Sequence, residues 1–386
     1  MFESSLSFPP VTLPPTADRL RSDVREFLKE SHSLLGWTPR SNFMSTFSAE
    51  FSQSIGSKGW LGLTWPKKYG GKERSALERF VVTEELLSAG APVAAHWVAE
   101  RQSGPLLIRY GTEKQRMEIL PKIAEGKCFF SIGMSEPDSG SDLASIRTRA
   151  EKTSHSWKIT GSKVWTSNAH INHWMILLAR TQPASENRHA GMSQFLIDLK
   201  NDNIRVNPIP NMLGQHDFNE VVFNETEIPL DRLIGKEGNG WHQVTAELAY
   251  ERSGPERFLS TYNILLELIN STGEQNNSEI CRAVGKLTAQ LISLRTMSIS
   301  IAGMLERGEN PDIAAAVVKD SGNEFEQKVI DIARQVLPIE PRQNGLNTEK
   351  YETMMAELIM QLPSFSFRGG TPEIMRGIIA RGLGVR

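Results

Sequence analysis

Residues 129–167 form the stretch that most constrains what this chain can fold into. They read FFSIGMSEPDSGSDLASIRTRAEKTSHSWKITGSKVWTS, and in them a β-prone run, residues 129–134, leads into the segment SEPDSGSD at 135–142. Small, turn-forming residues let a backbone approach a ligand closely, and their hydroxyl and amide groups can hold a polar heterocycle or a phosphate. This half predicts a strand followed by a loop, which is either a ligand site or an ordinary surface turn.

The second half of the stretch predicts two more strands, at 157–160 and 163–167, joined by a turn at 161–162. Trp165 stands two residues before Ser167, and side chains two positions apart on a strand point to the same face. We therefore expect an aromatic stacking surface beside a hydrogen-bonding group.

Length and charge set the class of protein. A chain of 386 residues is long for a single core and predicts two or three domains. Hydrophobic residues at 39% and charged residues at 23% are ordinary for a globular protein. The net charge of −2 gives no general attraction to nucleic acid or to an anionic membrane. No apolar run is long enough to span a bilayer.

The cysteines, the histidines and the N-terminus give further expectations. Cys128 and Cys281 lie far apart without metal-ligand spacing, and we interpret them as reduced thiols of a cytoplasmic protein. The histidines are scattered, so we assign no metal, and His170 and His173 are interpreted as structural. The opening residues lack the basic start and apolar core of a signal peptide and are expected to be an extended lead-in.

Periodicity divides the chain into three parts, which we predict as domains at 1–128, 129–239 and 240–386. The first has helical stripes at 18–30, 43–57 and 77–89. It also has a buried aromatic connector at 59–71 and a capping box from Thr112 to Gln115. The second has short β-prone runs that predict a small barrel or sandwich, with strands at 174–180, 193–198 and 220–223. The third returns to long helical stripes, typical of a bundle.

These motifs together resemble the acyl-CoA dehydrogenases. That family carries T/S-E-P-x-x-G-S-D followed by W-x-T/S about two dozen residues later, which here are residues 135–142 and 165–167. A GW…WP…YGG loop at 59–71 and a GGT-x-E-I-x-R ending at 369–376 are also similar to the family's. The resemblance covers nearly the whole chain and is weak at 1–17, 270–280 and 336–348.

The resemblance implies a fold and an activity. The fold is an α+β multidomain one: an N-terminal α-helical domain, a middle β-barrel or sandwich domain and a C-terminal four-helix-type bundle. The activity is FAD-dependent oxidation of an acyl-CoA to the trans-2-enoyl-CoA, as in β-oxidation of fatty acids or sterol side chains. A carboxylate removes the α-proton and the β-hydride goes to the flavin. Electrons then pass to an electron-transfer flavoprotein, and the assembly is a tetramer built as a dimer of dimers.

Residue roles follow from the same resemblance. The residues expected to contact FAD are Ile132, Met134, Ser135, Gly140, Ser141, Trp165, Thr166, Ser167, Thr371 and Glu373. Those expected to contact the acyl-CoA are Ser141, Arg252, Gly369 and Gly370, the last through its backbone N–H. Asp142 is interpreted as a turn or cap residue.

The catalytic base is expected at Glu251. The commonest family position for the base, immediately before G-T in the C-terminal motif, is here Gly369. Either the chain is inactive or its base lies elsewhere, and Glu251 with Arg252 matches the E-R pair that serves in isovaleryl-CoA and long-chain acyl-CoA dehydrogenases. A glycine at 369 would also leave room for a bulky or branched acyl group. Glu373 is the next candidate for the base.

A second departure from the family concerns assembly. The R-x-x-F-G segment that binds a neighbour's FAD pyrophosphate is missing, and residues 270–277 read NSTGEQNN. This loss is similar to the heteromeric dehydrogenases of steroid and bile-acid side chains, and it implies a second dehydrogenase-like chain and about one FAD per pair of chains. Arg282 or Arg295 could instead replace the missing arginine. Two alternative functions stay open: a non-catalytic partner subunit, and a flavin oxidase or monooxygenase.

Overall fold

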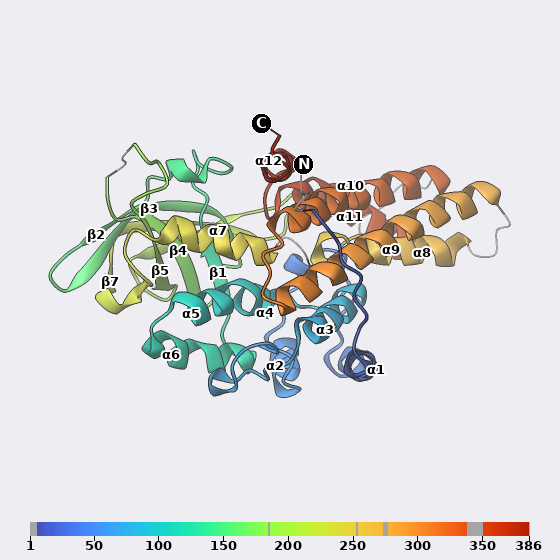
Figure 1. Ribbon diagram of the computed structural model, residues 1–386, viewed down its shortest axis with the longest axis horizontal. Coiled ribbons are helices and arrows are strands. Elements are labelled where there is room, and N and C mark those ends of the chain that lie inside the picture. Colours follow the sequence, from blue (N-terminus) through green and yellow to red (C-terminus); the bar gives the residue numbers. More distant parts are fainter. Residues whose placement is uncertain (1–5, 184–185, 252–253, 273–276, 338–349, 386) are drawn as a thin grey trace. The chain divides into compact units, whose positions relative to one another are not determined.

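The computed structural model describes residues 6–183, 186–251, 254–272, 277–337 and 350–385, without the side chains of 247–251 and 271–272 (Figure 1). The chain forms two compact units. The first, here the bundle unit, contains Met1–Thr46, Arg74–Pro92 and Glu251–Arg386. The second, here the sheet unit, contains Phe47–Glu73 and Val93–Tyr250.

The sheet unit is built on one mixed sheet. Its strands follow the order β6-β7-β3-β2-β4-β5-β8, and β1 pairs in parallel with β4. The bounds are β1 Phe130–Gly133, β2 Arg149–Lys152, β3 Ser156–Ser167, β4 Trp174–Arg180, β5 Met192–Asp198, β6 Ile204–Ile209, β7 Phe218–Pro229 and β8 Leu233–Ile234. The strands predicted at 174–180, 193–198 and 220–223 lie within β4, β5 and β7.

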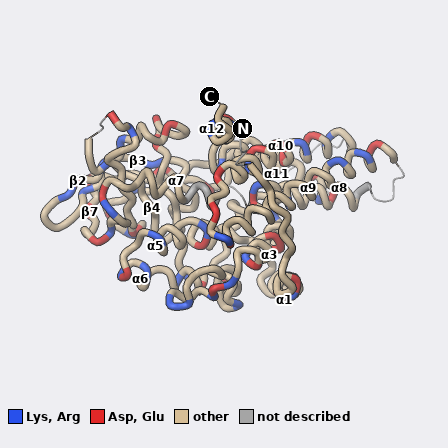
Figure 2. Tube along the Cα trace, viewed as in Figure 1, with Lys and Arg blue, Asp and Glu red and all other residues tan. Residues whose placement is uncertain are grey.

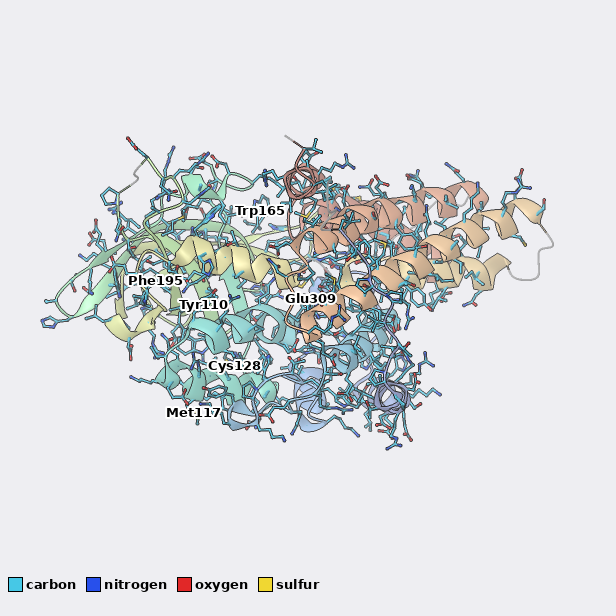
Figure 3. The ribbon with its side chains drawn as sticks, in the orientation of Figure 1. Tyr110, Met117, Cys128, Trp165, Phe195 and Glu309 are labelled. Carbon is cyan, nitrogen blue, oxygen red and sulfur yellow. The ribbon has the colours of Figure 1, made fainter. Side chains whose placement is uncertain are left out.

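The sheet curls over its own core. Trp157 of β3 and Phe195 of β5 meet edge-on with ring centroids 5.1 Å apart, although β2 and β4 lie between their strands. Figure 3 labels Phe195. Ile159, Leu177 and Val221 fill the same fully buried cluster. Strands that alternate inward and outward side chains can enclose such a core only when the sheet bends around it.

Short helices complete the sheet unit. They are α2 (Ala49–Ser57), α4 (Ala94–Val98), a π-helical turn η3 (Ala99–Ser103), α5 (Gly104–Tyr110), α6 (Glu113–Ala124) and α7 (Gly240–Glu251), the last shared with the other unit at its final residue.

The capping box predicted at Thr112 is confirmed, with reciprocal bonds to Gln115. The helix predicted over 43–57 is wrong at its start: η1 (Phe43–Ser45) ends first, and Ser48 caps α2 by accepting from the Phe51 N–H at 3.1 Å.

The bundle unit consists of long amphipathic helices. Helices α8 (Tyr262–Thr272), α9 (Ser278–Glu306), α10 (Asp312–Val336) and α11 (Lys350–Phe367) pack side by side (Figure 1), and α12 (Pro372–Gly382) packs on α10. Helix α1 (Pro15–Leu35) packs on α3 (Ala76–Ser88), which in turn packs on α9. Basic and acidic residues both occur along these helices (Figure 2), as expected of helices with a solvated face.

A buried ion network joins α1, α3 and α9. Glu84 accepts from Arg295 Nε at 2.5 Å and Nη2 at 3.0 Å, and Arg21 pairs with Glu84 and with Glu85. Arg25 pairs with Glu85 as well. Because both carboxylates are buried, each arginine offsets a large desolvation cost and fixes the relative position of the three helices.

The predicted fold is confirmed: helices come first along the chain, then the β part, then the helical bundle. Loop 59–71 is the buried aromatic connector that was predicted, since Trp60, Trp65 and Tyr69 are buried. Among the described residues, no helix has both the length and the apolarity needed to cross a membrane.

Candidate active site

The loop after β1 is organised by the side chain of Glu136. Its carboxylate accepts from the backbone N–H groups of Arg147 at 2.6 Å and Thr148 at 2.9 Å, and from Lys163 Nζ at 2.8 Å. Its backbone N–H and C=O close a turn on Ser139. In this loop Gly140 and Ser141 are exposed and Ser135 is half-buried.

Trp165 lies in an unusual conformation at the end of β3. Its φ is 58°, in the left-handed region, and the pairing of β3 with β7 shifts register between Lys163 and Thr166. Its side chain is 61% exposed and contacts Phe218 edge-on (Figure 3 labels Trp165). The expectation that Trp165 and Ser167 share a face came from simple alternation, and this bulge interrupts that alternation.

Three polar side chains hold the rest of the W-T-S segment in place. Ser131 Oγ donates to the Ser167 carbonyl at 2.8 Å, and Asn172 Nδ2 donates to Ser131 Oγ at 2.9 Å. Asn219 Nδ2 donates to the Thr166 carbonyl at 3.0 Å. Thr166 Oγ1 is buried and has no hydrogen-bond partner among the described residues.

These features fit a flavin. A large exposed indole is an apolar surface on which a planar ring system can stack. The Cβ direction at Gly140 meets nothing within 4 Å, so the loop backbone is open to a ligand. The orphaned Thr166 hydroxyl, with the half-buried Ser135 and Ser167, supplies the hydroxyl donors and acceptors that a polar heterocycle requires.

Helix α7 carries the candidate base. Met134 packs in one cluster with Val244 and Trp241 of the first turns of α7. This helix is therefore anchored to residues 134–142, here the flavin-type loop. Glu251 is the last residue of α7, seven positions after Val244, which is two helical turns. The side chain of Glu251 and the whole of Arg252 lie outside the described residues.

The C-terminal glycines form a turn with positive φ angles beside an arginine in the bundle unit. Gly369 has φ 71° and Gly370 has φ 106°. A Cβ at Gly369 would lie 2.8–3.0 Å from the guanidinium of Arg257, which donates to the Arg368 carbonyl at 3.4 Å. The space beside Gly369 is thus bounded by Arg257. The N–H of Gly370 donates to the Phe367 carbonyl at 3.2 Å, so a second acceptor would have to share it.

Arg368 precedes the turn at Gly369 and Gly370 and holds it in place through hydrogen bonds and an ion pair. Its Nη2 donates to Glu326 Oε2 at 3.0 Å and to the Glu256 carbonyl at 3.0 Å, and Glu326 also accepts from the Ser260 N–H. Burial lowers the pKa of Arg368, and the carboxylate of Glu326 opposes that shift. Glu326 is fully buried, so this ion pair ties α10 to the end of α11.

Thr371 and Glu373 begin α12. Thr371 Oγ1 accepts from the Ile374 N–H at 3.4 Å and caps the helix. Glu373 is exposed in the first turn, where its own backbone N–H and the Thr371 hydroxyl lower the pKa of its carboxyl group. A carboxylate with a lowered pKa is a weaker base, which makes Glu373 a poorer candidate than a desolvated one.

The remaining polar residues have local partners. His170 stacks on His216 with centroids 3.8 Å apart, and His173 Nδ1 accepts from the Phe129 N–H at 3.1 Å. Asp142 pairs with Arg188 across the surface. Within the described residues, no three His, Cys, Asp or Glu side chains gather as a metal site would require.

Glu136 and Lys163 were not among the residues predicted from the sequence. A signal was present, because Lys163 lies four residues after Ile159 on a strand whose buried positions alternate from Trp157, and a charge at an inward position needs a buried partner. Asn172 and Asn219 gave no such signal, since asparagine near a turn is ordinary.

The three domain models of acyl-CoA dehydrogenases match this chain: the N-terminal domain at residues 14–127, the middle domain at 131–226 and the C-terminal domain at 238–384. A curated relative, acyl-CoA dehydrogenase IpdE1 of Mycolicibacterium smegmatis (strain ATCC 700084 / mc(2)155), is 30% identical over 346 residues, covering 86% of each chain.

Two solved structures are similar over nearly the whole length. The steroid ACAD Tcur3481-Tcur3483 has a TM-score of 0.85 at 26% identity, covering 99% of this chain and 100% of the other. The ChsE4-ChsE5 complex from Mycobacterium tuberculosis has a TM-score of 0.84 at 26% identity, covering 98% and 100%. The chain belongs to the acyl-CoA dehydrogenase family of flavoprotein oxidoreductases.

Proposed function

We propose that this chain binds FAD and oxidises a bulky or branched acyl-CoA to its trans-2-enoyl-CoA. The observation that carries the proposal is that residues 134–167 combine an exposed Trp165 on a strained bulge, an open glycine turn at Gly140 and an unpartnered buried hydroxyl on Thr166. The loop and the helix that ends in Glu251 are joined through Met134 and Val244. Family membership supports the same assignment.

In the proposed mechanism, Glu251 removes the α-proton of the thioester. A thioester α-proton is a weak acid, so the site must also stabilise the negative charge that develops on the thioester oxygen, and backbone N–H donors of the 369–370 turn are proposed for this role. Ser135, Ser141, Trp165, Thr166 and Ser167 would hold the FAD, and the family resemblance assigns Thr371 and Glu373 to the same cofactor. When bound, FAD supplies the acceptor for the β-hydride.

The proposed base also requires a desolvated carboxylate. Burial raises the pKa of a carboxyl group and strengthens its carboxylate as a base. Arg252, next to Glu251 in the chain, would act on the charge of the acyl-CoA or of the base. The exposed Glu373 does not meet this requirement, and Glu251 is therefore the proposed base.

Anaerobic addition of acyl-CoA to the purified protein tests the activity directly. The protein, alone or with its partner chain, should show flavin absorption that bleaches when a suitable acyl-CoA is added. An intact assembly that holds neither flavin nor acyl-CoA would refute the proposal and would favour the non-catalytic partner subunit. Rapid oxygen consumption in place of reduction of an electron-transfer flavoprotein would favour the flavin oxidase or monooxygenase.

The proposed substrate is an acyl group with a branched or ring-bearing end, as in sterol-derived thioesters. Gly369 supports this because it removes a whole side chain from the position where the commonest base stands in the family. Arg257 limits the space gained for the acyl group, since its guanidinium bounds the space beside Gly369. A panel of straight, branched and sterol-derived acyl-CoAs tests this, and a preference for short unbranched chains would contradict it.

A heteromeric assembly is proposed for the FAD site. FAD pyrophosphate carries two negative charges that need arginine or helix N-terminal donors. Residues 273–276 of the segment concerned lie outside the described residues, and Arg295, one possible replacement, is held by Glu84. A solved structure similar to this chain is that of the ChsE4-ChsE5 complex. Native mass and FAD stoichiometry of the chain expressed alone decide the matter: a stable homotetramer with one tightly bound FAD per chain would exclude an obligate partner.

We also propose a cytoplasmic location with both thiols reduced. Cys128 is buried, and burial raises the pKa of its thiol to about 12, which leaves it unreactive (Figure 3 labels Cys128). Cys281 is exposed. Fluorescent tagging and fractionation of the cells test the location.

A further inference from the structure

A buried ion pair lies directly beneath the flavin-type loop. Lys163 is fully buried and Glu136 is 8% exposed, and Nζ lies 2.8 Å from Glu136 Oε1. Lys163 Nζ also donates to the Met134 carbonyl at 2.9 Å. Burial lowers the pKa of Lys163 to about 8, and Glu136 opposes that shift. Burial acts to raise the pKa of Glu136, but Lys163 and the Thr148 and Arg147 donors more than offset it, so the pKa is lowered.

The pair connects the two halves of the motif. Glu136 belongs to the SEPDSGSD loop. Lys163 lies on β3 immediately before the register shift that contains Trp165. A backbone bond adds to the link, because the Val164 N–H donates to the Ser135 carbonyl at 3.0 Å. Gly133 makes room chiefly for Met175: a Cβ there would lie 1.6 Å from Met175 Cε, and also in tight contact with the lysine, 3.3 Å from Lys163 Cγ.

Stability alone is a poor reason for such a pair. Replacing a buried ion pair by apolar residues of similar volume is often neutral or stabilising, whereas removing one partner is strongly destabilising. A left-handed conformation at a tryptophan is also costly, and it persists only where the surrounding structure over-determines it. Lys163 is the last residue paired with β7 before the bulge, so its fixed position sets the geometry of Trp165.

We propose that Lys163 and Glu136 are positioning residues for the flavin: they lock residues 134–136 onto β3 and hold Trp165 in its left-handed bulge. This inference rests on the proposed binding of FAD by the 134–167 segment. The pair acts through the loop backbone and Trp165, because both of its side chains are buried.

The test separates positioning from stability. The full-length chain, with its partner where one is required, is compared with E136Q, K163M and E136Q/K163M. The measurements are thermal unfolding, FAD affinity by equilibrium dialysis and the visible circular dichroism of bound flavin. Each single variant should unfold at a lower temperature, because it leaves one buried charge without its partner. The double variant should recover the unfolding temperature yet bind FAD at least about tenfold more weakly, with an altered flavin dichroism.

Two further variants make the result decisive. R232M/E118Q removes a half-buried ion pair of the same sheet unit, 2.9 Å between Nη1 and Oε2, and should leave FAD affinity unchanged. E136D keeps the charge but is one methylene shorter, so it cannot keep all three of the bonds that Glu136 accepts, and it should weaken FAD binding even if the double variant does not fold.

The outcomes distinguish this inference from the proposed function. If the parent binds FAD, and E136Q/K163M or E136D binds it as tightly, with an unchanged flavin dichroism, the pair has no positioning role. If FAD affinity follows the unfolding temperature across all variants, including the control, the role is one of stability and the inference is overturned. If the parent binds no FAD in any assembly, both the inference and the proposed function are refuted.

Discussion

The guanidinium of Arg257 lies where a side chain at position 369 would begin: a Cβ on Gly369 would be 2.8 Å from Arg257 Nη2. The turn at Gly369 also requires φ 71°, which costs a residue with a Cβ about 1–2 kcal/mol. Two independent constraints thus favour glycine at the position where the commonest base stands in the family. The base cannot be restored there without moving an arginine that is itself 3% exposed.

Gly369→Ala is therefore expected to destabilise the chain by about 1–3 kcal/mol, from backbone strain and contact with Arg257. The measurement is chemical unfolding of the parent and the variant. Gly285→Ala is the matched control, because its Cβ would meet nothing within 4 Å and it lies inside α9, where alanine is favoured over glycine by about 1 kcal/mol. An equally large loss in both variants would contradict the explanation.

Introducing a glutamate at 369 should not rescue the loss of Glu251. The double variant E251Q/G369E is expected to be as inactive as E251Q, since the new side chain would meet the Arg257 guanidinium. Turnover with the best acyl-CoA of the panel is the measurement. Recovery of a substantial part of parent turnover would show that Arg257 moves aside.

Glu251→Gln should keep the folded structure and the flavin content while reducing turnover by several orders of magnitude, because it removes the group that takes the α-proton. Glu373→Gln is the matched control: the lowered pKa and exposed position of Glu373 suit a helix-capping carboxylate rather than a base. Single-turnover reduction of the flavin by acyl-CoA distinguishes the two. Fast reduction in E251Q with slow reduction in E373Q would reverse the assignment.

His96 should make the stability of the chain depend on pH. It is buried, its Nδ1 lies 2.8 Å from Ser52 Oγ, and burial lowers its pKa to about 3 from the ordinary histidine value of 6.5. A lowered folded-state pKa contributes stability that is present above pH 6.5 and is lost as pH falls from there toward 3, at up to about 1.4 kcal/mol per pH unit. His96→Asn should remove about one proton from the slope of unfolding free energy against pH. An unchanged slope would show that His96 is protonated without cost.

The two arginines of α9 should behave differently. Arg295 is bound to Glu84 in the network with Arg21, so Arg295→Ala should lower the free energy of unfolding by about 1–3 kcal/mol. Arg282 is exposed on the same helix, and Arg282→Ala should change neither stability nor FAD content if a partner chain supplies the pyrophosphate contacts. Loss of FAD in the Arg282 variant would instead make Arg282 the replacement for the missing family arginine.

Some elements were predictable because their signals are local. The strand over 174–180 is a continuous apolar run, and the Thr112 capping box depends on residues three apart. The helix over 43–57 was predicted as one piece because its apolar residues fit the helical period, whereas Ser48 offers its hydroxyl to the Phe51 N–H and starts a new helix there. Local capping thus decided a boundary that periodicity alone did not.

The sequence by itself determined the order of helical, β and helical parts and the identity of the flavin-type motif, because periodicity and motif spacing are properties of neighbouring residues. Only the tertiary structure decided that Glu136 reaches Lys163 across 27 positions and that Arg257 stands beside Gly369 across 112. Such contacts arise when segments distant in the chain are packed together, and a buried charge then takes whatever partner the packing brings within reach. The left-handed Trp165 belongs to the same class, since the pairing of β3 with β7 creates the bulge.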